Sequence, residues 1–397
     1  MKPRIVTGLG VLSSLGVHDG AAFFEAAKDV APTSGVAKPE SFDAAKYEGQ
    51  PWRDASGHLP LLEVPGFDPK KHLGDKGLRT LDRLTKLLVV ASRICLHDAG
   101  FKAEGAWTEA PRGFGATSPT RIGVCCSNAY GSLEAIHELD SVAKLEDARY
   151  INPAKFPNTV SNSAAGYISI WEDLRALNVS VSDGVCGGLD AVAMADLLLS
   201  TGRADAIVTG GGESMSEALF LAFMKLDLLG DRKTTLGEGA AFVALESEAS
   251  AAARAARRYG AITGYGTAFV GPENPDAELL CLSKAALARA CKTALADAGL
   301  ESVDLVVSAG TGLDPDDSVL RDVRRELGLA APLADGCRRF GETLGASGSL
   351  GIAAALAAIN GSRAGVMLEG VAPTRADTVL VTSLGHYGNA SALVVTR

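Results

Sequence analysis

The chain has 397 residues, of which 47% are hydrophobic and 21% are charged, and its formal net charge is −9. Such values are typical of a globular protein that buries one large core or two of moderate size. The negative charge argues against nucleic-acid binding, which needs a basic face. No membrane span is expected, because no run of about 18 apolar residues occurs, and no long apolar stretch near the start predicts a secretory signal. The seven scattered cysteines fit free thiols in a reducing cytoplasm and lack metal-ligand spacing.

Short β-branched segments alternate with alanine-rich segments along the chain, which predicts an α/β protein with helices covering sheets. Residues Val30–Lys76 are rich in proline, glycine and charge and are expected to form a surface excursion rather than a folding unit. The predicted strands are Arg4–Thr7, Arg121–Cys125, Ala206–Thr209, Ala240–Leu245, Leu305–Val307 and Thr378–Thr382. The predicted helices are Leu81–Ala99, Leu189–Thr201, Lys284–Asp297, Ser318–Leu327 and Leu350–Asn360.

Two parts of the sequence repeat the same order of elements. A glycine-rich turn, an apolar helix and a strand follow one another from Gly187 and again from Gly348. Both helices lack charge over most of their faces, so both are expected to be buried. We therefore predict two similar halves, residues 1–256 and 257–397, each built around a central helix.

The stretch "VSDGVCGGLDAV" places Cys186 on a polar, glycine-rich turn where a helix begins. The positive end of a helix lowers the pKa of a thiol and favours the nucleophilic thiolate. Gly187 and Gly188 would let backbone amides approach a ligand, including a carbonyl oxygen that becomes negative during acyl transfer. The alternative is that Cys186 is a small buried residue at a tight packing point.

Eight segments, in order, resemble those of the β-ketoacyl-acyl-carrier-protein synthases of the thiolase superfamily. The resemblance implies a layered αβαβα fold with two pseudo-symmetric halves, Cys186 in the place of the nucleophile, an acyl thioester substrate delivered by an acyl carrier protein, and a dimer interface at Phe156–Ser169. The segments are "RIVTGLGVLSSLG", "FPNTVSNSAAGYIS", "VSDGVCGGLDAV", "GRADAIVTGGGES", "TTLGEGAAFVALES", "SAGTGLDPDD", "GETLGASGSLG" and "TSLGHYGNASALVV".

The sequence departs from this family at the polar catalytic positions. Ala309 and Glu342 stand where the family motifs carry two histidines, and Cys337 stands where they carry a lysine. Alanine donates no hydrogen bond, and an ionised glutamate repels an enolate oxygen. Losing one oxyanion donor costs on the order of 10²–10³ in rate, so losing both should suppress decarboxylative condensation. His386 takes the place of the gating phenylalanine, either as a substitute base near Cys186 or as a polar gate without a chemical role.

Three functions remain open on this basis. The first is a chain-length-factor-like subunit that pairs with an intact ketosynthase and does not condense alone. The second is an acyltransferase or thioesterase that uses Cys186 with Glu342 or His386, and the third is a condensing enzyme with rearranged acid–base groups. Heterodimer and homodimer are both compatible with the resemblance, and no cofactor or metal is expected. Phe220, Phe223 and Met224 would either bound the acyl chain or form ordinary core.

Overall fold

The computed structural model describes residues 1–28, 39–43, 58–102, 118–228, 235–272, 280–310, 317–363 and 365–397. Its strands form one long hydrogen-bonded path, with a short hairpin strand, β2 (Gly16–Asp19), paired to β1, and a separate two-stranded sheet of β3 (Leu61–Leu62) and β7 (Leu236–Gly237). The path runs β12 (Val366–Glu369), β11 (Leu333–Asp335), β10 (Leu305–Ser308), β13 (Thr378–Leu384), β14 (Asn389–Thr396), β9 (Gly260–Phe269), β1 (Arg4–Ser13), β8 (Gly239–Ser247), β6 (Ala206–Glu213), β4 (Ile122–Ser127) and β5 (Asn178–Val181).

The longest α-helices in the described part of the chain span residues 83–98, 187–200, 284–298 and 347–359. In chain order the α-helices are α1 (Gly20–Ala26), α2 (Lys70–Leu73), α3 (Arg83–Asp98), α4 (Leu133–Ser141), α5 (Ser163–Glu172), α6 (Gly187–Ser200), α7 (Glu217–Lys225), α8 (Glu248–Ala253), α9 (Lys284–Ala298), α10 (Ser318–Glu326), α11 (Cys337–Phe340) and α12 (Ser347–Ile359). Each predicted strand and each predicted helix overlaps one of these elements, so the alternation read from the sequence is confirmed.

The strand path contains the same arrangement twice. The order β5-β4-β6-β8-β1 matches β11-β10-β13-β14-β9, and in both runs the first two pairings are parallel and the last two antiparallel. Helix α6 follows β5 as α12 follows β11. The two runs join where β1 pairs with β9. The position between residues 256 and 257, in the connection from α8 to β9, stays a predicted boundary.

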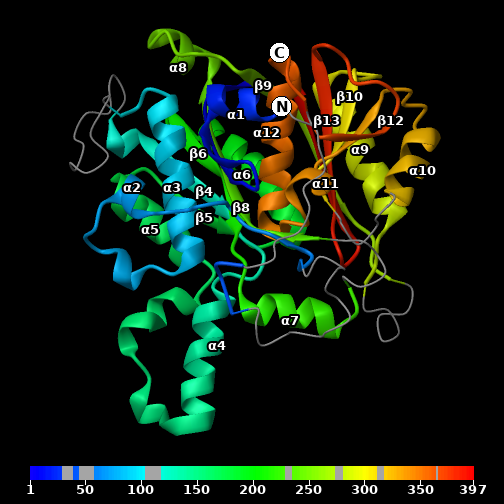
Figure 1. Ribbon diagram of the computed structural model, residues 1–397. Coiled ribbons are helices and arrows are strands. Elements are labelled where there is room, and N and C mark those ends of the chain that lie inside the picture. Colours follow the sequence, from blue (N-terminus) through cyan, green and yellow to red (C-terminus); the bar gives the residue numbers. More distant parts are fainter. Residues whose placement is uncertain are drawn as a thin grey trace.

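The two runs of strands form two facing sheets, here called the two sheets. With the helices between and outside them, they make five layers (Figure 1). Helices α6 and α12 lie between the two sheets, where one apolar cluster includes residues of both helices and inward-facing residues such as Val243 and Val395. Helices α3 and α5 cover the outer face of one sheet, and α9 and α10 cover the outer face of the other. Cys125 faces the inner cluster and Cys126 the outer one, as expected for successive residues of a strand.

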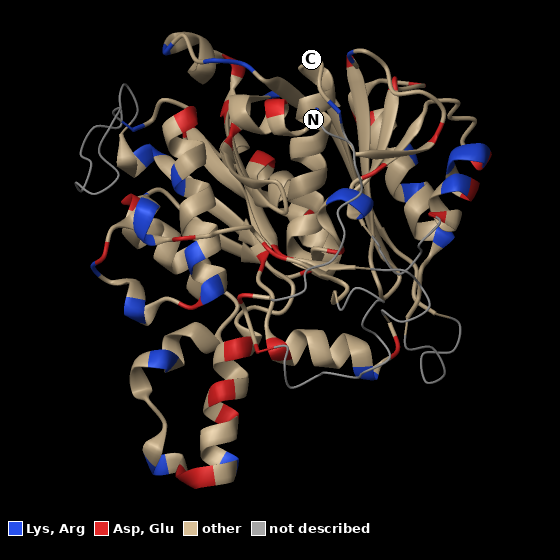
Figure 2. Cartoon of the chain, viewed as in Figure 1, with Lys and Arg blue, Asp and Glu red and all other residues tan. Residues whose placement is uncertain are grey.

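The two central helices differ in how fully they are covered. Every residue of α12 is buried, as predicted. The prediction for α6 is wrong in part: one face is buried, but Leu197 is 59% exposed and Met194 and Leu198 are only partly buried. Few charged side chains lie on either helix (Figure 2). The outward face of α6 is therefore apolar and has no covering element in the described part of the chain.

The prediction for Val30–Lys76 needs a correction. Residues 58–76 of this segment are described, and within them Leu59, Leu61 and Val64 are buried. Strand β3 pairs in parallel with β7, and Leu59 and Leu61 belong to the same apolar cluster as Cys186. The proline, glycine and charge around these residues obscured a short apolar run that packs beside the site. Residues 30–38 and 44–57 lie outside the described residues.

Below the layers, α4 and the short helical turns after it extend away from the body of the protein (Figure 1). This arm comprises residues 133–159. Its most exposed large apolar side chains are Leu145, Tyr150 and Phe156. Within the described residues, no helix is both long enough and apolar enough to cross a membrane.

Candidate functional site

Cys186 ends a one-turn 3-10 helix, η7 (Gly184–Cys186), and directly precedes α6. Its side chain is fully buried, and its Sγ donates a weak hydrogen bond to the carbonyl oxygen of Ser383 at 3.6 Å. The hydroxyl of Ser383 donates in turn to the carbonyl oxygen of Val185 at 2.8 Å. Ser383, near the end of β13 and three residues before His386, thus holds the cysteine turn in place.

The backbone amides of this turn are already used. The Cys186 amide donates to the carbonyl of Asp183 at 3.1 Å, and the Gly187 amide donates to the carbonyl of Gly184. In the free protein these two amides are therefore bonded within the turn, and their role in holding a substrate oxygen stays a prediction. The glycines also serve packing: a Cβ at Gly187 would lie 2.2 Å from Ser127 Oγ, and one at Gly188 would lie 2.6 Å from the Ser349 amide nitrogen.

The thiol of Cys186 differs from the expectation of a lowered pKa, while its role as a nucleophile stays a prediction. The pKa of the Cys186 thiol is raised far above its ordinary value, first by burial and then by the negative charges of Asp190 and Asp183. These effects outweigh the helix end, because the positive potential of a helix terminus is modest and two carboxyl groups oppose it. Cys186 is therefore a neutral thiol in the free protein.

Asp183 and Asp190 form a carboxyl pair beside the cysteine turn. Tyr265 Oη donates to Asp190 Oδ1 at 2.7 Å and Ser391 Oγ donates to it at 2.6 Å, while Asn389 Nδ2 donates to Asp183 Oδ1 at 3.1 Å. Burial, followed by the hydrogen bond with Asp183, raises the pKa of Asp190 to about 7. Sequence reasoning did not select this pair. The available signal was a pair of acidic residues, seven positions apart, on either side of the glycine-rich cysteine turn.

Glu342 and Ala309 lie close together, as the resemblance implies. Glu342 is buried in the loop before η8 (Leu344–Ala346), and its Oε1 accepts hydrogen bonds from the Leu344 amide at 3.0 Å and from Ser347 Oγ at 3.1 Å. Ala309 directly follows β10 and is buried. A Cβ at the next residue, Gly310, would lie 3.7 Å from Glu342 Oε1. This corner of the site therefore holds a carboxyl group beside an alanine that donates nothing.

His386 lies in the loop between β13 and β14. Its side chain is buried, and burial lowers the pKa of the imidazole, while the charge of Glu342 acts in the opposite direction. The imidazole is consequently neutral near pH 7. The structure therefore brings Glu342 and His386 into electrostatic contact.

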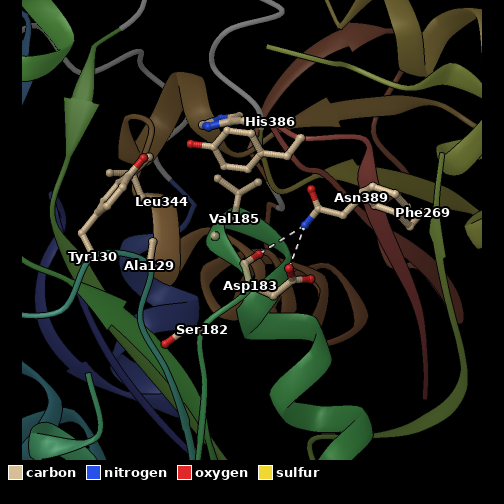
Figure 3. A pocket seen from close by; sticks show the side chains of 11 residues that line it. Ala129, Tyr130, Ser182, Asp183, Val185, Phe269, Leu344, His386 and Asn389 are labelled. Carbon is tan, nitrogen blue, oxygen red and sulfur yellow. Dashed lines mark hydrogen bonds between the residues drawn. The ribbon is translucent and has the colours of Figure 1, made fainter. Parts of the chain in front are cut away.

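A pocket of about 290 Å³ opens beside these residues (Figure 3). Asp183 and Asn389 lie next to one another on one side of it, and Tyr130 and Phe269 lie on opposite sides. Its lining does not include Cys186, whose neighbour Val185 faces the pocket instead. The lining residues are Ala129, Tyr130, Ser182, Asp183, Gly184, Val185, Phe269, Leu344, His386, Tyr387 and Asn389.

Glu213, at the end of β6, connects two walls of this pocket. Its Oε2 accepts hydrogen bonds from the Ala129 amide at 2.8 Å and from the Tyr130 amide at 3.3 Å, and the carboxyl also interacts with the Gly345 amide. Complete burial raises its pKa to about 8, so it is mostly protonated at pH 7. Sequence reasoning did not select Glu213, because a glutamate at the end of a strand is usually solvated.

Cys186 also belongs to an apolar cluster. Phe220 and Phe223 from α7 are buried in this cluster, and Met224 is partly buried against it. Their position beside Cys186 is compatible with both earlier interpretations, a boundary for an acyl chain and ordinary core. Among the described residues, no group of three or more His, Cys, Asp or Glu side chains is arranged to hold a metal ion.

Comparison with known proteins gives the family. The sequence model described as "Beta-ketoacyl synthase, N-terminal domain" matches residues 2–251. The chain belongs to the beta-ketoacyl synthase family. Among its curated relatives, "3-oxoacyl-[acyl-carrier-protein] synthase 2" of Coxiella burnetii is 28% identical over 99% of this chain and 98% of the relative. The protein of the same name from Staphylococcus aureus strain N315 is 26% identical over 94% of this chain and 89% of the relative.

Solved structures share the thiolase-like fold of this beta-ketoacyl synthase family member. "The ishigamide ketosynthase/chain length factor" and a beta-ketoacyl synthase from Burkholderia phymatum STM815 each superpose with a TM-score of 0.79 at 22% identity. Both comparisons cover the whole of this chain, and 99% and 100% of the respective structures. The predicted layered α/β fold is thus confirmed.

Proposed function

We propose that this family member is a chain-length-factor-like subunit of fatty acid or polyketide biosynthesis, which pairs with an active ketosynthase and does not condense acyl chains alone. The observation that carries the proposal is the corner of the site formed by Ala309 and Glu342. Decarboxylative condensation needs donors that stabilise an enolate oxygen. An alanine and a buried carboxyl group in the positions of the two family histidines do not supply them.

The charges around the pocket support the same conclusion. A malonyl extender carries a carboxylate until it loses CO₂, and like charges disfavour its entry. Asp183 lines the pocket, with Asp190 hydrogen-bonded beside it and Glu342 close to His386. No Lys or Arg is among the described lining residues.

The state of Cys186 is a further argument. A nucleophilic cysteine reacts as the thiolate. Burial and two neighbouring carboxyl groups keep this thiol protonated, so its main contribution would be to fill space beneath the pocket.

A partner surface is available for the proposed pairing. Strand β5 pairs with β4 along one edge and ends the described sheet on the other. The helices on its two faces present exposed apolar side chains, Ile170 of α5 at 74% and Leu197 of α6 at 59%. Open strand edges in natural proteins are usually covered. We propose that an active ketosynthase of the same fold covers this edge, with a second copy of this chain as the alternative, and that an acyl carrier protein delivers the acyl thioester.

The proposal is tested by assaying the subunit alone and in a co-expressed complex with a ketosynthase that carries the intact Cys-His-His set. We expect no CO₂ release from malonyl-carrier protein by the subunit alone and full activity in the complex. Replacing Cys186 with alanine in the complex should leave product formation within about twofold. Rapid decarboxylation by the isolated subunit would refute the proposal.

A second candidate is an acyltransferase, thioesterase or rearranged condensing enzyme that uses Cys186 with Glu342 or His386. It is favoured by the retained thiol and by a neutral imidazole interacting with a carboxyl group, a combination that serves acid–base chemistry. Incubation with an acyl-carrier thioester should then add the acyl mass to Cys186, and His386→Phe should abolish the adduct. For either function we propose a cytoplasmic location, because the seven cysteines are odd in number and scattered along the sequence, as in proteins of a reducing compartment.

A further inference from the structure

Aromatic side chains surround the opening of the 290 Å³ pocket. Phe269 at the end of β9 is 65% exposed, Tyr387 in the loop after β13 is 61% exposed, and Tyr130 is 36% exposed. They come from three separate parts of the chain and all line the same pocket. Exposed aromatic rings are unfavourable in water unless a ligand or partner covers them.

One side of the same pocket is acidic. Asp183 lines it, and its Oδ1 accepts a hydrogen bond from Asn389 Nδ2, which also lines the pocket. Behind Asp183 lies Asp190, which accepts hydrogen bonds from the hydroxyl groups of Tyr265 and Ser391 and also shares a hydrogen bond with Asp183. In the described part of the chain, neither aspartate forms an ion pair with Lys, Arg or His.

Among the described residues that line the pocket, none is Lys or Arg. His386 is kept neutral by burial. Burial is the main cause that raises the pKa of the Tyr130 hydroxyl to about 12, so this group is uncharged near pH 7. The electrostatic potential that the described residues create in the pocket is therefore negative. The malonyl extender used by ketosynthases of this family is itself an anion.

A pocket with a carboxylate on one side and aromatic rings around it matches the chemistry of an ammonium group. A cation gains from the faces of aromatic rings, as in the cages that recognise quaternary ammonium ligands. It gains further from a carboxylate that has no other cationic partner. We propose that this pocket binds an acyl thioester whose chain ends in an ammonium group, with Asp183 as the ion-pairing residue and Tyr130, Phe269 and Tyr387 as the aromatic walls.

The size of the pocket agrees with this ligand. A pocket of about 290 Å³ has room for a short aminoacyl group. The proposal specifies the class of acyl chain and rests on the proposed function only for the thioester. The ammonium selectivity is a property of the pocket alone.

Binding to the purified full chain is measured by isothermal titration calorimetry with three N-acetylcysteamine thioesters. The β-alanyl thioester ends in an ammonium group, the butanoyl thioester carries a methyl group in its place, and the succinyl thioester ends in a carboxylate. We expect the β-alanyl probe to bind at least about tenfold more tightly than the butanoyl probe, and the succinyl probe to bind most weakly. Equal affinities for the first two probes, or no measurable binding of the β-alanyl probe, would overturn the proposal.

Variants assign the selectivity to the named residues. Asp183→Asn keeps the shape of the side chain, and we expect it to reduce the tenfold preference to less than threefold. Asp377→Asn, an exposed aspartate that pairs with Arg397 outside the pocket, is the matched control and should keep the preference. Tyr387→Leu should weaken β-alanyl binding severalfold while leaving butanoyl binding within twofold. If Asp183→Asn does not fold, Tyr387→Leu alone tests the proposal. An undiminished preference in both Asp183→Asn and Tyr387→Leu would contradict the proposal.

These measurements need no carrier protein, partner or acyl transfer. Failure of the ammonium preference would leave the proposed subunit role standing. Failure of the pairing and decarboxylation assays would leave the binding result standing.

Discussion

Gly188 of α6 and Ser349 of α12 meet backbone to backbone at the centre of the molecule. A Cβ at Gly188 would lie 2.6 Å from the Ser349 amide nitrogen, and a Cβ at Gly348 would lie 2.8 Å from the Leu189 amide nitrogen. The two helices therefore approach through reciprocal glycines near their first turns. This contact positions the Cys186 turn against the loop that carries Glu342.

Gly188→Ala is expected to destabilise the protein by roughly 1–3 kcal/mol, because the added methyl group is opposed by backbone atoms that have little room to move. Thermal and urea unfolding measure the change. Gly166→Ala in α5 is the matched control, since nothing lies within 4 Å of a Cβ there. The control should be neutral or gain roughly 0.5–1 kcal/mol from the better helix propensity of alanine. Equal unfolding midpoints for the two variants would contradict the close approach.

Cys186 should resist alkylation in the native protein. Its thiol is buried and its pKa is raised, whereas alkylation requires an accessible thiolate. With iodoacetamide at pH 8, we expect peptide mass spectrometry to find Cys186 labelled at least about tenfold more slowly in native protein than in protein unfolded in guanidinium. Fast, selective labelling of Cys186 in the native state would instead identify it as an activated nucleophile and favour the acyltransferase alternative.

Leu197→Arg and Ile170→Arg should disrupt the proposed subunit pairing. Both side chains are exposed apolar groups beside the open edge of β5, and an interface that buries them would have to bury an unpaired charge in each variant. Light scattering on the co-expressed complex should show separated subunits. Val371→Arg tests whether a new surface arginine is harmful in itself, because Val371 is also highly exposed but lies in the loop after β12. Intact complexes in all three variants would place the interface elsewhere.

Glu213 should make the protein less stable as the pH rises. In the folded state its pKa is raised to about 8, while an unfolded glutamate has a pKa near 4.3. Between these values the folded state holds a proton that the unfolded state has released, so the free energy of unfolding falls with increasing pH. The stabilisation is fully present below about pH 4.3 and is lost as the pH approaches 8.

Glu213→Gln mimics the protonated carboxyl group and removes this titration. We therefore expect the variant to gain stability over the wild type at pH 8.5 and to gain much less at pH 5, as measured by urea unfolding at both values. Glu248→Gln, at the exposed start of α8, controls for the loss of a negative charge. Parallel stability profiles for wild type and Glu213→Gln would show that the carboxyl does not titrate in this window.

The alternation of β-branched and alanine-rich segments was sufficient to predict the fold class, because helices and strands leave different periodicities in the sequence. The repeated order of elements around Gly187 and Gly348 likewise predicted two central helices. The same reasoning overestimated the burial of α6, since an apolar face in a sequence does not tell whether the chain itself or a partner covers it. It also assigned residues 58–64 to the surface, although their apolar run packs beside Cys186.

At the site, the sequence alone predicted which side chains are missing, because the resemblance places Ala309 and Glu342 at the positions of two histidines. Only the tertiary structure decided the state of Cys186, because the pKa of a thiol depends on burial and on charges that the fold brings near it. The Asp183–Asp190 pair and its neighbours Tyr265, Asn389 and Ser391 come from segments up to about 200 positions apart. A local sequence pattern cannot predict these contacts, because they arise from the packing of β9 and β14 against the start of α6.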